Sequence, residues 1–179
     1  MRLRAGASPA HDGAAMSGRR EYLCYTDGSC KTGDGAAGGW GFVIKPRDGA
    51  ASDGDETPRE GYGKARGTHA KVMEIRAVAE ALGALPDRAC AIVFSDNRPL
   101  VQSLASGRMD ALARADPLVA DSARRILELL HDRQLVVTWQ WVRSHNGNAG
   151  NERADWLARQ GAREAKSELA AEARQRRGR

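Results

Sequence analysis

The spacing of apolar and polar positions predicts three strands in succession, over residues 22–26, 40–45 and about 61–67. The first run ends at Asp27-Gly28-Ser29, and the second stops at Pro46. A glycine-rich turn over residues 33–39 and a loop over residues 47–59, dense in Asp, Gly and Ser, separate the three runs. Consecutive strands joined by turns predict an antiparallel meander.

A helical period replaces the strand pattern after this meander. Helices are predicted over residues 72–85, 99–104 and 117–130, and from Asn151, which we expect to be the N-cap of the last helix. Pro86 ends the first of these runs, because proline cannot continue a helix.

Two more strands are predicted between the helices. The continuous apolar run Ala91-Ile92-Val93-Phe94 is typical of a strand that is buried on both faces. Residues 135–142 alternate, which places Trp139 and Trp141 on one face and favours packing of both rings over base stacking. The order βββαβααβα predicts an α/β fold, with a five-stranded mixed sheet of three antiparallel strands and then two parallel ones, flanked by helices.

Four acidic residues stand at the ends or starts of these predicted elements. Asp27 and Asp96 follow strands, whereas Glu74 and Asp155 lie near the starts of helices. Mg²⁺ binds a few carboxylates and keeps positions for water and phosphate oxygens, so convergent carboxylates suit two-metal hydrolysis of a phosphodiester. Each acid alone is more typical of a turn or a solvated helix face, but together they indicate a metal-dependent nuclease.

The length of 179 residues and the distribution of charge predict one domain with two basic ends. Residues 1–20 lack periodicity and are predicted to form a disordered basic tail. Residues 164–179, with five basic and three acidic side chains, are set apart as a basic C-terminal tail. The domain between them, residues 21–163, holds 19 basic and 19 acidic side chains. The net charge of +5 therefore comes from the ends, and the domain's charge alone does not indicate a polyanion partner.

The cysteines and the apolar runs indicate the compartment. Cys24, Cys30 and Cys90 are odd in number and show no CxxC spacing, which argues against a disulfide framework or a zinc site. No apolar run approaches the length needed to cross a membrane, and residues 1–20 lack the apolar segment of a secretory signal. We expect a cytoplasmic protein without a membrane partner.

Six short motifs follow one another along about residues 21–163. They are Tyr25-Thr26-Asp27-Gly28-Ser29-Cys30, Gly38-Gly39-Trp40-Gly41, Met73-Glu74, Ser95-Asp96, Trp139-Gln140-Trp141-Val142-Arg143-Ser144-His145 and Asn151-Glu152-Arg153-Ala154-Asp155. As a set, in this order, they resemble the motifs of type 1 ribonuclease H, the family that cuts the RNA strand of RNA–DNA hybrids. The resemblance implies a ribonuclease H-like fold and catalytic domain.

The resemblance also implies roles for individual residues. It implies that two Mg²⁺ ions, for which Mn²⁺ could substitute, are held by four carboxylates: Asp27, Glu74, Asp96 and Asp155. Asp27 would lie between the ions, one of which would lower the pKa of the attacking water while the other would stabilise the leaving 3′ oxygen. His145 would assist proton transfer, and Glu152 is an alternate acid one helical turn before Asp155.

Nucleic-acid contacts are likewise implied by the resemblance, for Gly28, Ser29, Cys30, Thr68, His69, Lys71, Arg98 and Asn151. The chain departs from the family here, since Ala70 stands where the family has an Asn that contacts the DNA strand, and Arg98 where it often has Gln. Residues 105–123 also lack the Trp and the Lys cluster of a basic protrusion that many bacterial members carry. We therefore expect weak affinity for the hybrid unless the arginine-bearing tails contact phosphates.

The sequence thus predicts a monomeric endoribonuclease that acts on RNA–DNA hybrids, and it leaves two alternatives open. The first is a nuclease of the same fold that cuts double-stranded RNA or a DNA junction, supported by the altered stretch over residues 68–71. The second is a module that binds nucleic acid without cutting it. Loss of a carboxylate would be the usual sign of such a module, and all four carboxylates are present.

Overall fold

The computed structural model describes residues 19–31, 36–47, 58–144 and 146–178. Nearly all of the predicted tail over residues 1–20, most of the loop over residues 47–59, and His145 lie outside these ranges.

Five strands form one mixed sheet in the described residues. They are β1 (Glu21–Cys30), β2 (Gly38–Pro46), β3 (Arg59–Ala65), β4 (Cys90–Ser95) and β5 (Val136–Trp141). The strand order is β3-β2-β1-β4-β5, with β1 in the centre. The β1–β2 and β2–β3 pairs are antiparallel, and the β1–β4 and β4–β5 pairs are parallel. The predicted fold class is therefore confirmed.

The helices that connect and cover this sheet are α1 (Ala70–Ala84), α2 (Arg98–Ala105), α3 (Met109–Ala115), α4 (Pro117–Asp132) and α5 (Ala149–Arg177). The sequence pattern did not predict α3, because its seven residues bury only Met109 and show no helical period. None of the helices in the described ranges has both the length and the apolar character required to cross a bilayer.

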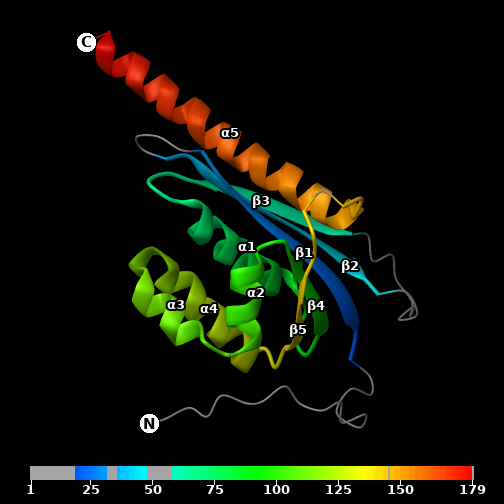
Figure 1. The fold of residues 1–179 in the computed structure, drawn as a ribbon. Coiled ribbons are helices and arrows are strands. Elements are labelled where there is room, and N and C mark those ends of the chain that lie inside the picture. The colour runs from blue at the N-terminus through cyan, green and yellow to red at the C-terminus, as the bar shows by residue number, and fades with distance from the viewer. Residues whose placement is uncertain (1–18, 32–35, 48–57, 145, 179) are drawn as a thin grey trace.

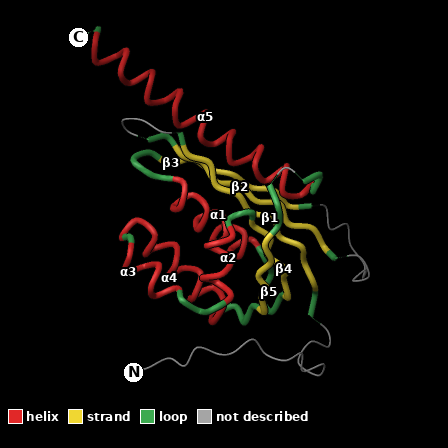
Figure 2. The backbone as a smooth tube through the Cα atoms, viewed as in Figure 1, coloured by secondary structure: helices red, strands yellow, loops and turns green. Residues whose placement is uncertain are grey.

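The helices lie on both faces of the sheet. In Figure 1, α5 crosses one face, while α1 to α4 gather on the other face. There α1 packs on β1 and β2, and α4 packs on α1. Figure 2 shows that the C-terminal end of α5 continues beyond the ends of the strands. The sheet is therefore sandwiched near β1, the strand that carries Asp27.

The main core lies between the sheet and α1. Met73, Ile75 and Leu82 of α1 are fully buried there. From the strands, Cys24 and Val93 belong to the same core, because they are partners in the β1–β4 pairing and share a face of the sheet. This burial fixes the rotation of α1 and with it the direction of Glu74.

The opposite face of the sheet is closed by small residues. A Cβ added to Gly39 of β2 would lie within 3.0 Å of the Ala158 carbonyl oxygen, and one added to Gly161 would lie within 3.0 Å of the Gly63 carbonyl oxygen. The backbone of α5 therefore lies directly against β2 and β3. Side chains at these positions would push α5, which carries Asp155, away from the sheet.

The start of α5 corrects one prediction and its end adds a finding. Asn148 is the N-cap, because its side chain accepts a hydrogen bond from the Asn151 N–H at 3.1 Å. Asn151 is instead the third residue of the helix and is buried, so its prediction as N-cap is wrong. At the other end, α5 runs to Arg177 and includes residues 164–177, which were set apart as a tail.

Candidate active site

Three carboxylates from three different elements meet beside the central strand. Asp27 lies on β1, Glu74 on α1, and Asp96 directly after β4. One oxygen atom of each carboxylate lies within 4.8 Å of the others. Asp27 and Glu74 are buried, and Asp96 is half-buried. The parallel pairing of β1 with β4 brings Asp27 and Asp96 to the same end of the sheet.

The surroundings of Asp27 favour its protonated form. Burial, followed by the charges of Asp96 and Asp155, raises the pKa of Asp27 to about 8. A hydrogen bond between the side chains of Asp27 and Asp155 acts in the same direction, whereas the Gly28 N–H, which donates to Asp27 Oδ1 at 2.7 Å, opposes it. The site concentrates negative charge beyond what its neighbours neutralise.

Glu74 reaches the strand because Gly28 has no side chain. A Cβ at Gly28 would lie within 3.0 Å of the Glu74 backbone, so α1 can approach β1 only at a glycine. Burial, and then the charges of Asp27 and Asp96, raise the pKa of Glu74 well above its usual range. Glu74 Oε2 is buried without a hydrogen-bond partner. Such an orphaned acceptor is costly unless another group completes the site.

Asp96 is oriented by two neighbours. The Ser144 hydroxyl donates to Asp96 Oδ2 at 2.7 Å, and the Trp141 indole N–H donates to the Asp96 carbonyl oxygen at 3.0 Å. Trp141 is 44% exposed, so the expected packing of both tryptophans holds only for Trp139, which contacts the core. The indole of Trp141 instead holds the backbone of Asp96 at the edge of the site.

Asp155 approaches from the opposite face of the sheet on α5. It hydrogen-bonds with Asp27 but does not belong to the group within 4.8 Å. Its Oδ1 forms an ion pair with Arg159 Nε, one turn further along the helix, at 2.7 Å. Glu152, the alternate acid, is exposed in the first turn of α5. The fourth carboxylate is therefore near the cluster and already paired with a cation.

The donor set fits a hard divalent cation. All of the clustered side chains offer carboxylate oxygens, the ligands that Mg²⁺ and Mn²⁺ favour. A cation would give the orphaned oxygen of Glu74 a partner and would offset the repulsion that raises the pKa of Asp27 and Glu74. Asp27, Glu74 and Asp96 are the residues that could hold it, with Asp155 beside them.

Comparison with known proteins decides the family of this site. The RNase H family model matches residues 19–163. The chain belongs to the ribonuclease H family. It is therefore a nuclease of that family, a hydrolase that binds nucleic acid and uses a divalent metal, and the buried acids lie where such a metal could bind.

The relatives extend over most of the chain. Ribonuclease H of Polaromonas naphthalenivorans (strain CJ2) is 35% identical over 162 residues, which cover 86% of this chain and 94% of the relative. The crystal structure of LC9-RNase H1, described as a type 1 RNase H with the type 2 active-site motif, is similar with a TM-score of 0.68 and 24% identity, covering 82% of this chain and 74% of that chain. LC11-RNase H1 in complex with RNA/DNA hybrid is similar with a TM-score of 0.58 and 20% identity, covering 80% of this chain and 98% of that one. These two structural likenesses concern the fold.

Four of the predicted nucleic-acid contacts lie at one end of β1. Gly28 packs against the backbone of α1, and Ser29 pairs with Gly39 in the sheet. The Cys30 thiol lies 3.5 Å from the Thr68 carbonyl oxygen, which joins the end of β1 to the start of α1. Thr68 is buried and its hydroxyl oxygen has no hydrogen-bond partner. The structure places these residues around the end of β1 and the approach to α1, and Gly28 among them contacts the Glu74 backbone.

The other four are more dispersed. His69 Nε2 lies 2.8 Å from Asp116 Oδ2, so its ring already has a partner. The Arg98 guanidinium lies over the Trp141 ring, 5.6 Å from its centroid. Asn151 is buried, and its side-chain oxygen is without a partner. Lys71, the fourth, lines a cavity beside the site.

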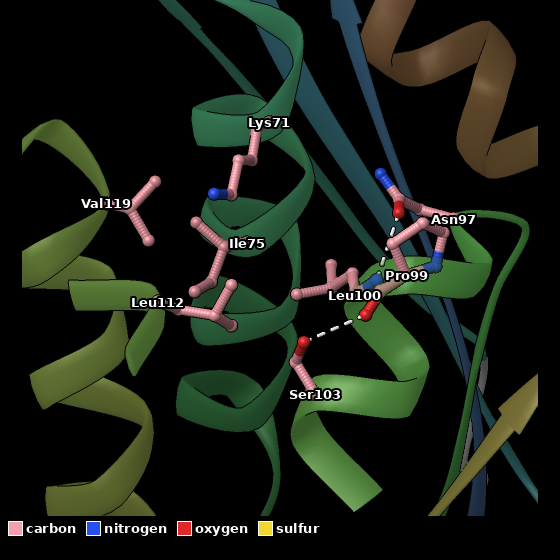
Figure 3. Close-up of a pocket in the computed structure, with 8 residues that line it drawn as sticks. All are labelled: Lys71, Ile75, Asn97, Pro99, Leu100, Ser103, Leu112 and Val119. Atoms are coloured by element: carbon pink, nitrogen blue, oxygen red, sulfur yellow. Dashed lines mark hydrogen bonds between the residues drawn. The ribbon is translucent and has the colours of Figure 1, made fainter. Parts of the chain in front are cut away.

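That cavity has a volume of about 310 Å³ and lies between α1, α2 and the α3–α4 pair. Figure 3 shows Ile75 and Leu100 pointing into it from α1 and α2, with Leu112 on the opposite wall. Asn97, the residue after Asp96 in the chain, also lines the cavity. The interior is apolar, which suits packing more than phosphate binding.

Three polar residues that contact the carboxylates are not among the site residues predicted from the sequence: Asn97, Ser144 and Arg159. Asn97 caps α2 by accepting from the Leu100 N–H at 3.1 Å, and its side chain also hydrogen-bonds with Glu74. Ser144 and Arg159 contact Asp96 and Asp155, respectively. Only Asn97, followed by Pro99 at the start of a predicted helix, carries a recognisable capping signal.

Proposed function

We propose that this protein is an endoribonuclease that hydrolyses the RNA strand of RNA–DNA hybrids with two bound Mg²⁺ ions and leaves 5′-phosphate and 3′-hydroxyl ends. The observation that carries the proposal is the group of carboxylates from Asp27, Glu74 and Asp96, with Asp155 hydrogen-bonded to Asp27. The hybrid bound to LC11-RNase H1, a protein of the same fold, supports the substrate. Mn²⁺ is the expected substitute, because it accepts the same oxygen ligands.

The ions, when bound, lower the pKa of the attacking water and stabilise the leaving 3′ oxygen. Asp27 is central because it interacts with the carboxylates on both sides, Asp96 and Asp155, and together with Glu74 these residues would hold the metal. Glu74 is held in reach by the glycine contact with β1, and Asp96 is held by Ser144. These contacts orient the carboxylates before the substrate arrives, which lowers the cost of assembling the site.

His145 is proposed as the group that transfers protons. It follows Ser144, whose hydroxyl contacts Asp96, and this chain position supports the role. An imidazole exchanges protons near neutral pH, as general acid–base chemistry requires.

Two orphaned oxygens support the proposed nucleic-acid contacts. The Thr68 hydroxyl and the Asn151 side-chain oxygen are buried without partners on the two sides of the carboxylates, on the approach to α1 and on α5. Polar atoms in that state gain most from a ligand that hydrogen-bonds with them. We propose that the strands of the hybrid contact these residues together with the end of β1, Gly28 to Cys30.

A second substrate, double-stranded RNA, is favoured by one observation. Ala70 offers no side-chain amide where the family contacts the DNA strand, and neighbouring His69 is occupied by Asp116. Neither residue therefore offers a free side-chain group that would select a DNA strand over an RNA strand.

The test compares substrates. End-labelled duplexes of about 20 base pairs, longer than a domain of this size contacts, would be offered as hybrid, duplex RNA and duplex DNA with Mg²⁺ or Mn²⁺. Cleavage of the RNA strand of the hybrid alone, with 5′-phosphate ends, is expected. Cleavage of duplex RNA as fast as the hybrid would contradict the proposed selectivity for hybrids. Cleavage of none of the three duplexes would refute the proposal.

We also propose that the enzyme acts as a monomer in the cytoplasm. All four carboxylates of the site come from one chain, so no second copy is needed to complete it. Cys24, Cys30 and Cys90 form no disulfide in the described residues, which suits a reducing compartment. Sedimentation of the purified chain at micromolar concentration tests the first statement.

A further inference from the structure

The last 14 residues of α5, 164–177, lie beyond the segment that the RNase H family model matches. They form a regular helix whose C-terminal end extends past the strands (Figures 1 and 2). This extension has two opposite faces of opposite charge, and only one of them is neutralised by the rest of the protein.

The acidic face is bound to β3. The Tyr62 hydroxyl donates to Glu164 at 3.0 Å, and Lys64 and Arg66 pair with Glu168. Arg66 also pairs with Glu172 at 2.6 Å. These pairs form a ladder, in which every second residue of β3 faces every fourth residue of α5. The two spacings match, because two residues of a strand advance about 6.8 Å and four residues of a helix about 6 Å. The strand therefore fixes the rotation of the extension.

The basic face points away from that ladder. Lys166, Arg174 and Arg177 are exposed, and the structure gives none of them an ion pair among the described residues. Lys166 continues the row of Asp155, Arg159 and Arg163, which are spaced by four, four and three residues. Arg174 and Arg177 follow after steps of eight and three residues. Lys166 and Arg177 are eleven residues apart, close to three full turns, so the row stays on one side of the helix.

The composition of the extension indicates what this face could bind. Residues 164–177 contain one large apolar side chain, Leu169, which is too little for a helix-to-helix interface or for burial in a membrane. A row of unpaired cations that begins at a nuclease site is complementary to a phosphate backbone. The row is also continuous with the face of α5 that approaches Asp27.

We propose that Lys166, Arg174 and Arg177 form a binding surface for the phosphate backbone of the substrate outside the carboxylate site. The inference rests on the proposed function for its substrate, and it assigns the extension of α5 as an affinity element. From Asp155 to Arg177 the helix advances about 33 Å, the length of about ten nucleotide steps along one strand. The surface therefore acts on long duplexes and not on short ones.

The test uses a triple variant, Lys166→Gln, Arg174→Gln and Arg177→Gln, because Gln keeps helix propensity and removes the charge. The matched control removes three exposed arginines outside α5, by Arg47→Gln, Arg88→Gln and Arg124→Gln. Binding to a hybrid of about 20 base pairs would be measured in Ca²⁺ between 50 and 200 mM salt. Cleavage of that hybrid and of one of about 8 base pairs would be measured in Mg²⁺.

Loss of three phosphate contacts should make the slope of log K against log salt shallower by about 3. Over the stated range the wild type should then lose about 40-fold more affinity than the triple variant, while the control keeps the wild-type slope. The triple variant should cleave the short hybrid at the wild-type rate and the long one less efficiently at low substrate concentration.

Equal slopes for wild type and triple variant would overturn the inference while leaving the proposed function intact. An equal loss in the control triple would also overturn it, since general charge would then explain the effect. Polyglutamate or anionic vesicles could displace the labelled hybrid from the protein more strongly than unlabelled hybrid does. That result would also overturn the inference, because the basic face would then bind an acidic protein or a membrane. If the wild type cleaves neither hybrid, the proposed function fails, and the binding slopes still decide the role of the extension.

Discussion

Arg159 Nε lies 2.7 Å from Asp155 Oδ1, so the fourth carboxylate of the site is paired with a cation from its own helix. The guanidinium and a divalent ion would both interact with the same carboxylate. Arg159→Gln should therefore tighten the binding of Mn²⁺ in the absence of nucleic acid by about 2- to 5-fold, as expected for a partly exposed pair. Calorimetric titration measures the effect. Arg163→Gln, one turn further away, is the control. Weaker metal binding by Arg159→Gln would show that Arg159 and the metal do not compete for the Asp155 carboxylate.

Stability should depend on pH through Asp27. Its pKa is raised to about 8 in the folded state, above the value near 4 in the unfolded chain, so the folded state holds the extra proton. Without divalent metal, the free energy of unfolding should fall as pH rises from about 4 to about 8. Asp27→Asn should reduce that fall and unfold at a higher temperature than the wild type at pH 8.5. Thermal melts at several pH values measure both effects, and a wild-type melting temperature that rises over this range would contradict the assignment.

Gly28→Ala should displace Glu74. The added Cβ would meet the backbone of α1 within 3.0 Å, and such overpacking costs about 1–3 kcal/mol of stability. Activity should fall further than stability accounts for, because α1 carries Glu74. Gly83→Ala in α1 is the control, since its Cβ would meet the flexible end of Arg125 and make an ordinary contact with Leu129. Denaturant unfolding measures the stability of both variants, and cleavage assays measure their activity. Full activity of Gly28→Ala would show that the close approach of α1 to β1 is not needed.

His145→Ala should slow cleavage by about 10²- to 10⁴-fold at saturating substrate, the range of general acid–base groups. His131→Ala, an exposed histidine at the end of α4, should have no effect. Single-turnover rates separate this loss from a change in affinity. A rate for His145→Ala within a few-fold of wild type would remove His145 from the proposed mechanism.

The sequence alone was sufficient to predict the sheet and the two acidic residues at the ends of its strands. Asp27 and Asp96 follow runs whose apolar pattern specifies strands, and the pairing of β1 with β4 then brings them together. Glu74 could be placed on a helix, but its closeness to the strand depends on the contact at Gly28, which no periodicity encodes.

Other features depend on contacts between residues far apart in the chain. The extension of α5 is polar on nearly all sides, so its pattern resembles a solvated tail, and its pairing with Lys64 and Arg66 appears only in the fold. The contact of Ser144 with Asp96 spans 48 residues and likewise has no local signal. The short α3 has too few residues for a period to be read.

The most direct test of the carboxylate site is cleavage of an RNA–DNA hybrid in Mg²⁺ by the wild type and by Asp27→Asn, each shown to be folded by its melt. Asn keeps the size of the side chain and can still accept from the Gly28 N–H, but it removes the charge that would hold the metal. We expect cleavage by the wild type and a loss of several orders of magnitude in the variant. Cleavage by Asp27→Asn at near the wild-type rate would contradict the proposed mechanism.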